Sequence, residues 1–477
     1  MIPDWLLGME RCECFQYELA DLTVAPLVSV ITPFFDTGSV FEQTRASLLG
    51  QSFQQWEWII VNDASSDPFS RAILAETRDM DPRIKVLDQP VHRGPSAARN
   101  LAARLTRAPY LFFLDSDDLI EPTALEKLLW CLESHPEWTM CKGYTHGFGA
   151  QSYVSMAGFE CPWLFLDRNP ITLTALVRRD AFIAIGGFDE EMRTGLEDWD
   201  LWLRFAAHEY WGHTIPEVLD WYRRRPSHAD RWGLWTERGA SQTRRMLRHR
   251  YPLLFRQGPV YIPEHPFDES GMPSCENVPS FNSLKPRERV LLVVPSVDVL
   301  SVFKPELVPP DHPVTVVALG PSERTPESLI AFSTPETFIL AHFLHPDTYL
   351  RFLLYLVQSR KFDRALLWDC SLTLKLVPLL MEYNPGMTFE RCDANGIHLL
   401  NLAEMTDFLE SRDLAEALAM QAVQACARQR QDDPHTRRLT CHPEWLQQLG
   451  TFGVRLFLLK ERTAYWGRWL RECFRLT

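Results

Sequence analysis

The stretch Tyr110-Leu-Phe-Phe-Leu-Asp-Ser-Asp-Asp118 carries five apolar residues that lead directly into three carboxylates. A continuous apolar run with aromatic residues is typical of a strand that is buried on both faces, as in a parallel sheet. Ligands of open α/β sheets bind at the carboxyl ends of such strands, where Asp115, Asp117 and Asp118 lie. Crowded carboxylates repel one another unless a cation joins them, and hard oxygen ligands suit Mg²⁺ or Mn²⁺. The stretch therefore predicts a divalent metal site, and the alternative is a solvated turn that caps the next helix.

The composition narrows the class of protein. The chain has 477 residues, enough for two or three domains, and its 46% hydrophobic residues are typical of a packed globular protein. A formal net charge of −13 argues against general binding to nucleic acid. We find no apolar run of about 18 residues that could span a membrane. The 11 cysteines lack regular spacing, and with no recognisable secretory signal we expect reduced thiols in a cytoplasmic protein.

Strand and helix signals alternate through the first 134 residues. The helix signals include a capping box formed by Ser39 and Glu42, and a proline at position 68, where a first helical turn tolerates it best. Strands alternating with helices predict a doubly wound, parallel α/β sheet. The expected strands cover residues 27–33, 56–61, 84–87 and 110–114, and the expected helices begin at Ser39, Pro68, Ser96 and Pro122.

Polar residues follow three of the expected strands. They are Thr32 with Asp36, Asp63 with Asp67, and Asp115 with Asp117. A parallel sheet brings the carboxyl ends of its strands to one edge, where they would form a pocket. One carboxylate of that pocket can accept hydrogen bonds from a base or ribose while a metal binds the diphosphate. The coincidence favours a nucleoside diphosphate site over a solvated turn.

Seven motifs occur in a fixed order over roughly residues 26–225. They are Val28-Ser-Val-Ile-Thr-Pro33, Ile60-Val-Asn-Asp-Ala-Ser-Ser-Asp67, Gly94-Pro-Ser-Ala-Ala-Arg-Asn100, Phe113-Leu-Asp-Ser-Asp-Asp118, Asn169-Pro-Ile-Thr, Gly186-Gly-Phe-Asp-Glu190 and Leu196-Glu-Asp-Trp-Asp-Leu-Trp-Leu-Arg204. In order and spacing, these motifs resemble those of family 2 glycosyltransferases. The resemblance implies the GT-A fold, a nucleotide-sugar donor (UDP-, GDP- or dTDP-linked), a divalent cation (Mn²⁺ or Mg²⁺) and inversion at the anomeric carbon.

The resemblance implies donor-binding roles in the first three motifs. Pro33 and Phe35 match the loop that lies along the nucleoside, and Phe35 stands where the family usually has Tyr. Asp63 matches the carboxylate that contacts the base. Arg99 matches a basic residue near the donor, although its pairing could equally be structural.

The Asp-Ser-Asp sequence matches the family's DxD motif. Asp115 would lie near the ribose and the metal, Ser116 would contact the nucleotide sugar, and Asp117 would be a direct metal ligand. Asp118 is expected to cap the helix that follows. Arg225 occupies a position where many relatives have His. Because Arg cannot bind a metal but can pair with phosphate, we expect Arg225 to contact the diphosphate, and the alternative is a solvated basic turn.

Asp198, preceded by Glu197, matches the family's catalytic base. An acceptor hydroxyl is a poor nucleophile at neutral pH, and a carboxylate within hydrogen-bond reach can remove its proton. Glu197 should raise the pKa of Asp198 through like-charge repulsion. The alternative is that Glu197, Asp198 and Asp200 are first-turn acids that favour a helix N-terminus. The apolar residues at positions 199, 202, 203 and 206 have helical spacing and are expected to be core rather than a sugar platform.

A second α/β pattern begins at Val290 and resembles, less specifically, the N-terminal lobe of GT-B glycosyltransferases. The glycine-rich loop of that lobe is replaced by Ser296-Val-Asp-Val-Leu-Ser301. We expect a partial, non-catalytic, Rossmann-like domain that orients an acceptor or a partner. Basic and aromatic residues between positions 436 and 477 suggest either a helix at a membrane surface or a terminal helix packed on the second domain.

The sequence thus predicts a metal-dependent, inverting glycosyltransferase that acts on a hydroxyl of a glycan or lipid-linked acceptor in cell-surface polysaccharide synthesis. We expect it in the cytoplasm, with peripheral contact to the inner face of the membrane through the C-terminal helix. The alternatives are a sugar-phosphate nucleotidyltransferase and a non-catalytic carbohydrate-binding scaffold. The expected segments are an N-terminal extension (1–26), a GT-A domain (27–256), a linker (257–287), a Rossmann-like domain (288–400) and a helical C-terminal region (401–477).

Overall fold

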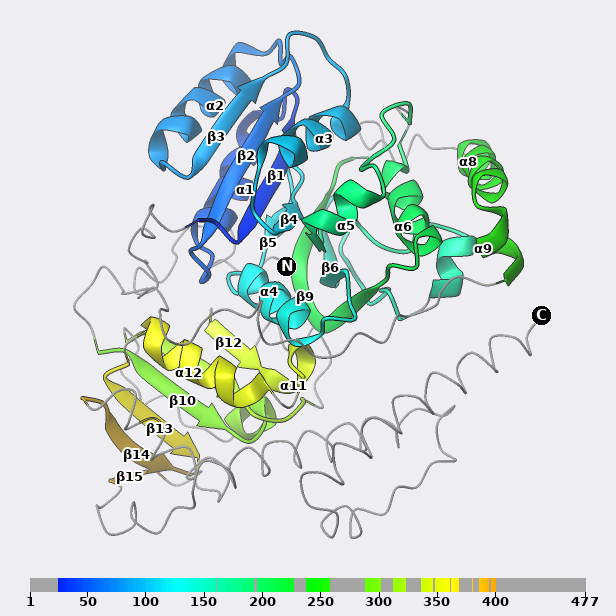
Figure 1. Cartoon of the computed structure of the whole chain (residues 1–477). Helices are drawn as coiled ribbons and strands as arrows, with labels where there is room; N and C mark the ends of the chain where they lie inside the picture. Colours follow the sequence, from blue (N-terminus) through cyan, green and yellow to red (C-terminus); the bar gives the residue numbers. More distant parts are fainter. Residues whose placement is uncertain are drawn as a thin grey trace. The chain divides into compact units, whose positions relative to one another are not determined.

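The computed structural model divides the chain into two compact units, which we describe separately (Figure 1). The first contains the described residues up to Gln257, and almost all of those from Glu288 onward lie in the second. Most of the N-terminal extension, nearly all of the linker and the whole helical C-terminal region lie outside the described residues. The structure describes residues 25–160, 162–192, 195–226, 237–257, 288–301, 312–322, 336–345, 348–360, 362–368, 380, 386–393 and 396–399.

Four parallel strands form one side of the sheet in the first unit, in the order β3-β2-β1-β4. Val28 at the start of β1 pairs with Trp56 on one side and with Tyr110 on the other, so the strands end near one edge. β1, β2 and β4 are almost wholly buried, which confirms the expectation from their continuous apolar runs. Their bounds are β1 (Val28–Phe34), β2 (Trp56–Asn62), β3 (Ile84–Asp88) and β4 (Tyr110–Phe113).

The helices between these strands begin close to the predicted positions. The α2 helix begins at Pro68, and the Asp67 carboxylate caps it by accepting a 2.8 Å hydrogen bond from the Ser70 amide. The predicted capping box is wrong, because Ser39 lies inside a short 3₁₀ turn (η2, Gly38–Val40) that leads into α1 without a side-chain cap. The α3 helix packs against β1 and β2. The helices are α1 (Phe41–Leu49), α2 (Pro68–Met80), α3 (Pro95–Leu105) and α4 (Ala124–Ser134).

The sheet is mixed rather than wholly parallel, which corrects the prediction of a doubly wound parallel sheet. β8 runs antiparallel to β4, and the order continues β4-β8-β6-β9-β5 with β7 paired to β6. β8 has only three residues, and such a short apolar run carries no local signal for the direction of its pairing. These strands are β5 (Leu119–Ile120), β6 (Met140–Gly149), β7 (Tyr153–Ser155), β8 (Leu176–Arg178) and β9 (Gly212–Arg224).

An aromatic cluster forms the core of the second half of this unit. Trp199 and Trp202 on α6 are buried, together with Leu203 and Ala206, as predicted from their helical spacing. Phe159 packs edge-on against Trp202 with ring centroids 5.5 Å apart. The remaining helices of the unit are η3 (Pro162–Leu166), α5 (Arg179–Ala184), α6 (Glu197–Ala207), α8 (Glu237–Arg250) and α9 (Pro252–Gln257).

The second unit contains a six-stranded sheet in the order β12-β11-β10-β13-β14-β15, counted over its described residues. β10 pairs in parallel with β11 and β13, whereas β14 and β15 are antiparallel. Its α/β character agrees with the second pattern in the sequence, and its likeness to a GT-B lobe stays a prediction. The elements are β10 (Val290–Val294), η5 (Val297–Ser301), β11 (Val314–Ala318), β12 (Glu336–Ile339), α11 (Leu340–Phe343), α12 (Tyr349–Arg360), β13 (Arg364–Trp368), β14 (Thr388–Cys392) and β15 (Ile397–Leu399).

Within the part of the chain that the structure describes, none of the helices is long and apolar enough to cross a membrane.

Candidate active site

The loops that follow β1, β2 and β4 meet at the edge of the sheet. Asp36, in the loop after β1, accepts hydrogen bonds from the Ser66 hydroxyl at 2.9 Å and the Asp67 amide at 2.8 Å. On the other side of the same loop, the hydroxyls of Thr37 and Ser116 lie 2.7 Å apart. Thr32, in contrast, is buried in the sheet and accepts a hydrogen bond from the Trp58 indole, so it belongs to the core.

Phe35 and Asp63 both contact His92. The Phe35 ring is 41% exposed and its centroid lies 4.2 Å from that of His92, whose Nδ1 is 2.9 Å from Asp63 Oδ2. Asp63 is buried, and its carboxylate accepts 2.7 Å hydrogen bonds from the amides of Arg93 and Gly94. Asp63 therefore holds the turn that begins α3, beside an exposed aromatic ring. The roles of Pro33, Phe35 and Asp63 toward a nucleoside remain predictions.

Arginines pair with both carboxylates of the DxD motif. Asp115 Oδ1 lies 2.5 Å from Nη2 of Arg99. Asp117 Oδ2 accepts hydrogen bonds from Nη2 of Arg225 at 2.7 Å and from its Nε at 3.2 Å. Between them, the backbone carbonyl of Ser116 accepts a hydrogen bond from the Thr44 hydroxyl, which fixes the loop against α1.

Asp118 has a different role from the predicted one. It is buried, and its Oδ1 accepts a 2.8 Å hydrogen bond from the Arg223 amide on β9 instead of capping α4. The prediction is wrong because β5 separates Asp118 from α4, which begins at Ala124. Burial and the neighbouring Asp117 and Asp115 carboxylates raise the pKa of Asp118 well above its usual range.

Arg223 is a site residue that the sequence argument missed. Its Nε donates to the backbone carbonyl of Asp117 at 2.7 Å, and its Nη2 donates to Gln43 at 2.6 Å. Three arginines are consecutive at positions 223 to 225, and a strand turns alternate side chains to opposite faces. Arg223 and Arg225 are two positions apart, and both contact the DxD loop. This spacing of two residues is the signal that could have identified Arg223 once Arg225 was selected.

Arg99 connects the DxD motif to the start of α6. Its side chain is 3% exposed, and besides Asp115 it contacts Glu197, with Nη1 2.9 Å from Oε1. Although burial acts to lower it, the Asp115 and Glu197 carboxylates raise the pKa of Arg99. The buried Arg99 guanidinium thus contacts two acids, Asp115 and Glu197, that are 82 residues apart in the sequence.

Asp198 is held in a defined orientation one residue further along α6. It is 9% exposed; Oδ2 accepts a 2.7 Å hydrogen bond from Asn169, and Oδ1 accepts one of 2.9 Å from the Trp199 amide. Burial, and secondarily the charge of Glu197, raise the pKa of Asp198 to about 7. The sequence predicted the effect of Glu197, whereas burial is the larger cause of the raised pKa.

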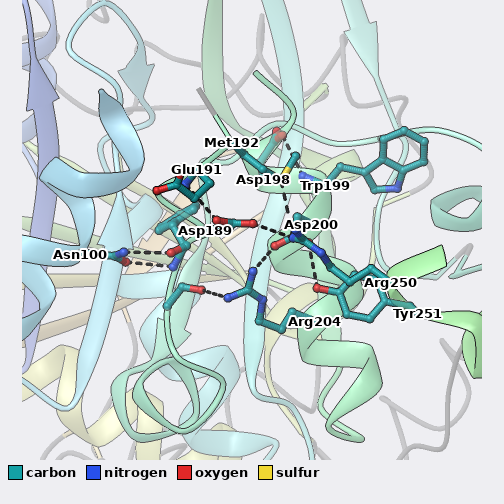
Figure 2. A network of polar contacts seen from close by, with 12 residues as sticks. Asn100, Asp189, Glu191, Met192, Asp198, Trp199, Asp200, Arg204, Arg250 and Tyr251 are labelled. Atoms are coloured by element: carbon teal, nitrogen blue, oxygen red, sulfur yellow. Dashed lines mark hydrogen bonds and ion pairs between the residues drawn. The ribbon is translucent and has the colours of Figure 1, made fainter. Parts of the chain in front are cut away.

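The third acid of α6 has a structural role. Figure 2 shows Arg204, Arg250 and Tyr251 converging on Asp200, which is fully buried. Arg250 lies 2.7 Å from Asp200 and 2.8 Å from Asp189, so it links α6 to the segment before that helix. The three adjacent acids therefore differ: Glu197 pairs with Arg99, Asp198 bonds Asn169, and Asp200 anchors α6 against the α8–α9 corner.

Asp115 and Asp117 fit a divalent cation by their chemistry. Mg²⁺ and similar ions are commonly held by one or two carboxylates, with water and substrate phosphates as the other ligands. The DxD acids lie close enough for their charges to raise the pKa of Asp118, and a cation would relieve that repulsion. Over the described residues, no three His, Cys, Asp or Glu side chains gather as a metal site. Asp115 and Asp117 are thus the two carboxylates that could hold such a cation, and in this structure they pair with Arg99 and Arg225.

Residues 29–184 match the model of a family described as Glycosyl transferase family 2. The first unit carries a family 2 glycosyltransferase domain. The matched segment includes the DxD motif and Arg99 and ends before Glu197. With its mixed α/β sheet, the domain is GT-A-like, as the motifs implied.

Curated relatives of this glycosyltransferase domain include proteins of polysaccharide synthesis. The chain is 29% identical over 210 residues to the O-antigen biosynthesis protein RfbC of Myxococcus xanthus, covering 43% of this chain and 16% of that protein. It is 28% identical over 196 residues to a chondroitin synthase of Escherichia coli, covering 40% of this chain and 28% of the relative. The chain thus spans less than a third of the length of either relative. A crystal structure of S. aureus TarS 1–349 aligns at 20% identity and a TM-score of 0.36, covering 41% of this chain and 60% of that one.

Proposed function

We propose that this chain is an inverting glycosyltransferase that transfers a sugar from a nucleoside diphosphate donor to a hydroxyl of a glycan or glycolipid acceptor. The observation that carries the proposal is the Arg99 bridge, because it brings the DxD loop and the Glu197-Asp198 pair to the same guanidinium. The name of the O-antigen relative supports cell-surface polysaccharide synthesis as the setting.

The donor would lie at the strand edge. Phe35 offers an exposed ring for the base, Pro33 lies beside it at the end of β1, and Asp63 supports the loop opposite. Asp115 and Ser116 lie at the adjoining loop and would contact the ribose and the sugar. A UDP-, GDP- or dTDP-linked sugar fits this description equally.

A divalent cation, Mn²⁺ or Mg²⁺, would be held by Asp117 and Asp115 and would supply positive charge to the departing diphosphate. Arg225 pairs with Asp117 and lies just beyond the end of β9, about half exposed. Because guanidinium groups bind phosphate oxygens well, Arg225 would contact the diphosphate when the donor is bound.

Asp198 would act as the general base, with Glu197 as the neighbouring charge that keeps its pKa high. Its carboxylate would accept the proton of the acceptor hydroxyl while the oxygen attacks the anomeric carbon. A pKa of about 7 suits that role, since the group is ionised at neutral pH and still basic enough to take a proton. A single base on the face opposite the leaving group gives inversion.

Two other functions are less well supported. A sugar-phosphate nucleotidyltransferase would use the same strand edge and cation, but it gives no reason for the Arg99 contact to Glu197. A non-catalytic carbohydrate-binding scaffold would keep the fold, but it gives no reason for a buried base with a raised pKa. The family 2 match favours transfer over both.

The other segments have proposed roles that rest on sequence. The second unit would orient an acceptor or a partner without catalysis. The basic, aromatic segment at residues 436–477 would contact the inner face of the membrane, where lipid-linked acceptors lie; it falls outside the described residues. We also propose that the segments of the chain end at residues 26, 256, 287 and 400, as the sequence predicted.

The direct test is a panel of nucleotide sugars incubated with the full-length chain and Mn²⁺, with release of nucleoside diphosphate as the signal. Transfer to an added acceptor and the anomeric configuration of the product, read by NMR, then test inversion. Release of inorganic diphosphate from a nucleoside triphosphate and a sugar phosphate would instead identify a nucleotidyltransferase.

We expect Asp117→Asn to weaken Mn²⁺-dependent binding of UDP or GDP by at least roughly tenfold, because it removes a charged metal ligand. Calorimetry of the nucleoside diphosphate with and without Mn²⁺ measures the effect. Asp79→Asn, at an exposed aspartate on α2, is the matched control and should bind as the wild type does. Equal Mn²⁺ dependence in wild type and Asp117→Asn would remove Asp117 from the metal site.

A further inference from the structure

Asn169 is a polar residue of the site to which no role has been assigned above. Its Nδ2 donates a 2.7 Å hydrogen bond to Asp198 Oδ2, across 29 residues of sequence. The other oxygen of Asp198 is occupied by the Trp199 amide at 2.9 Å. The carboxylate therefore has one donor on each oxygen, which defines the plane of the group.

We propose that Asn169 is a positioning residue, which fixes the orientation of the Asp198 carboxylate and supports its charged form for proton transfer. The proposal rests on the proposed function, since it takes Asp198 as the base.

The fold places Asn169 before any substrate binds. It follows η3, and the Trp199 indole donates a 2.6 Å hydrogen bond to the Phe165 carbonyl of that turn. Phe165 is itself buried against Trp211, with ring centroids 5.0 Å apart. Trp199 thus secures the segment that carries Asn169 against the helix that carries Asp198. Pro170 adds to this, because the residue before a proline is restricted to extended conformations.

The orientation of the amide follows from the charge of its partner. An ionised carboxylate only accepts hydrogen bonds, so a reversed amide would set Oδ1 of Asn169 against Oδ2 of Asp198. In the orientation with the donor on Asp198, Asn169 Oδ1 is buried and has no hydrogen-bond partner among the described residues. An unpaired buried acceptor is destabilising. Both orientations therefore carry an unfavourable contribution, and the observed one keeps the donor on the Asp198 carboxylate.

The contact opposes the other influences on Asp198. Burial and the Glu197 carboxylate disfavour the charged form, while the Asn169 hydrogen bond, the Trp199 amide and the more distant Arg99 favour it. Glu197 on α6 and Arg99 on α3 are the charged residues with the largest effects on the pKa of Asp198. Asn169 is a neutral donor, so it can favour the carboxylate without neutralising the charge that makes it a base.

The test is the pH dependence of kcat/KM in Asn169→Leu, which keeps the approximate size of the side chain and removes the donor. We expect the acidic limb to move to higher pH by about one to two units, as for a lost hydrogen bond to a charged group, and kcat/KM at pH 7 to fall at least roughly tenfold. Asn169→Ser keeps a donor on a shorter side chain, so its acidic limb should lie between those of the wild type and Asn169→Leu. It also provides the comparison if the leucine variant does not fold.

The control is Gln51→Leu. Gln51 is a buried amide whose hydrogen bonds reach the Ser47 and Glu121 carbonyls and the Leu125 amide, away from Asp198. The Gln51→Leu variant should lower the midpoint of thermal unfolding without moving the acidic limb of the kcat/KM profile. An acidic limb in Asn169→Leu that stays at its wild-type pH overturns the proposal, even if the rate falls.

A second measurement does not depend on activity. The difference in unfolding free energy between wild type and Asp198→Asn, followed from about pH 4 to pH 9, reports the pH at which Asp198 titrates in the folded chain. On the Asn169→Leu background this transition should move upward by the same one to two units. If no nucleotide sugar is turned over, the transfer proposal fails while this shift still tests the contact. An unchanged transition overturns the role of Asn169.

Discussion

Replacing Asp198 with Asn is expected to lower kcat by about 10²–10⁴-fold, the usual contribution of a general base. Asn has the shape of Asp but cannot take the proton of the acceptor hydroxyl. Donor binding should persist, because the strand-edge loops and Arg99 do not depend on this carboxylate. Steady-state transfer assays and calorimetry of the nucleoside diphosphate measure the two quantities.

The pH profile of the wild type sharpens this prediction. The raised pKa of about 7 means that kcat/KM should rise as the pH passes from 6 to 8, since only the ionised Asp198 accepts a proton. Stability has the opposite dependence. Because the pKa in the folded chain lies above that of the unfolded chain, the contribution of Asp198 to stability is complete below about pH 4 and is lost as the pH rises through 7.

Asp180→Asn is a suitable control for Asp198→Asn, because Asp180 is an exposed acid of the same half of the domain. It should retain wild-type activity and the same pH profile. Full activity in Asp198→Asn would show that another group accepts the proton. Loss of donor binding in that variant would show instead that Asp198 belongs to the donor site.

Replacing Arg99 with Met is expected to reduce the free energy of unfolding by about 3 kcal/mol, toward the lower end of the range for breaking a buried ion pair. The side chain of Arg99 is 3% exposed and that of Glu197 is 13% exposed, so the loss of Arg99 would leave the Glu197 charge largely uncompensated. Asp115 is 35% exposed, and water would relieve part of its loss. Arg99→Lys should restore only part of this stability, because one ammonium cannot reproduce two separate guanidinium contacts. Chemical denaturation measures both variants.

The control for Arg99 is Arg93→Met, which breaks the exposed contact between Arg93 and Glu190. Such surface pairs contribute about 0.2–1 kcal/mol, so this variant should be close to wild type. Adding Glu197→Gln to Arg99→Met should cause less loss than the sum of the two single changes, since both remove the same pair. Additive effects would mean that Arg99 does not stabilise Glu197 as the structure indicates.

The parallel half of the domain could be predicted from local sequence. Each of β1, β2 and β4 is a short apolar run between turn signals, and burial on both faces requires that composition wherever the strand is placed. The position of the DxD motif followed from the same rule, because the residues directly after a parallel strand must lie at its carboxyl end. Pro68 likewise set the start of α2.

Other features depended on contacts between distant segments. Asp118 was expected to cap a helix, but a two-residue strand places it against the Arg223 amide. The direction of β8 and the choice of Arg223 and Arg225, among three consecutive arginines, depend on strand pairing that no local pattern encodes. The same holds for Asn169, whose partner is 29 residues away.

By itself, the sequence determined that the first four strands form a parallel α/β sheet with carboxylates at its edge, and its motifs indicated a family 2 glycosyltransferase domain. It could do so because apolar runs, prolines and motif spacing act through neighbouring residues. Only the tertiary structure decided that Arg99 joins Asp115 to Glu197 and that Asn169 bonds Asp198. Those contacts arise when the sheet and α6 pack together and exclude water. Burial then strengthens the contacts of a single guanidinium or amide. The spacing of residues along the chain does not encode which groups are buried together.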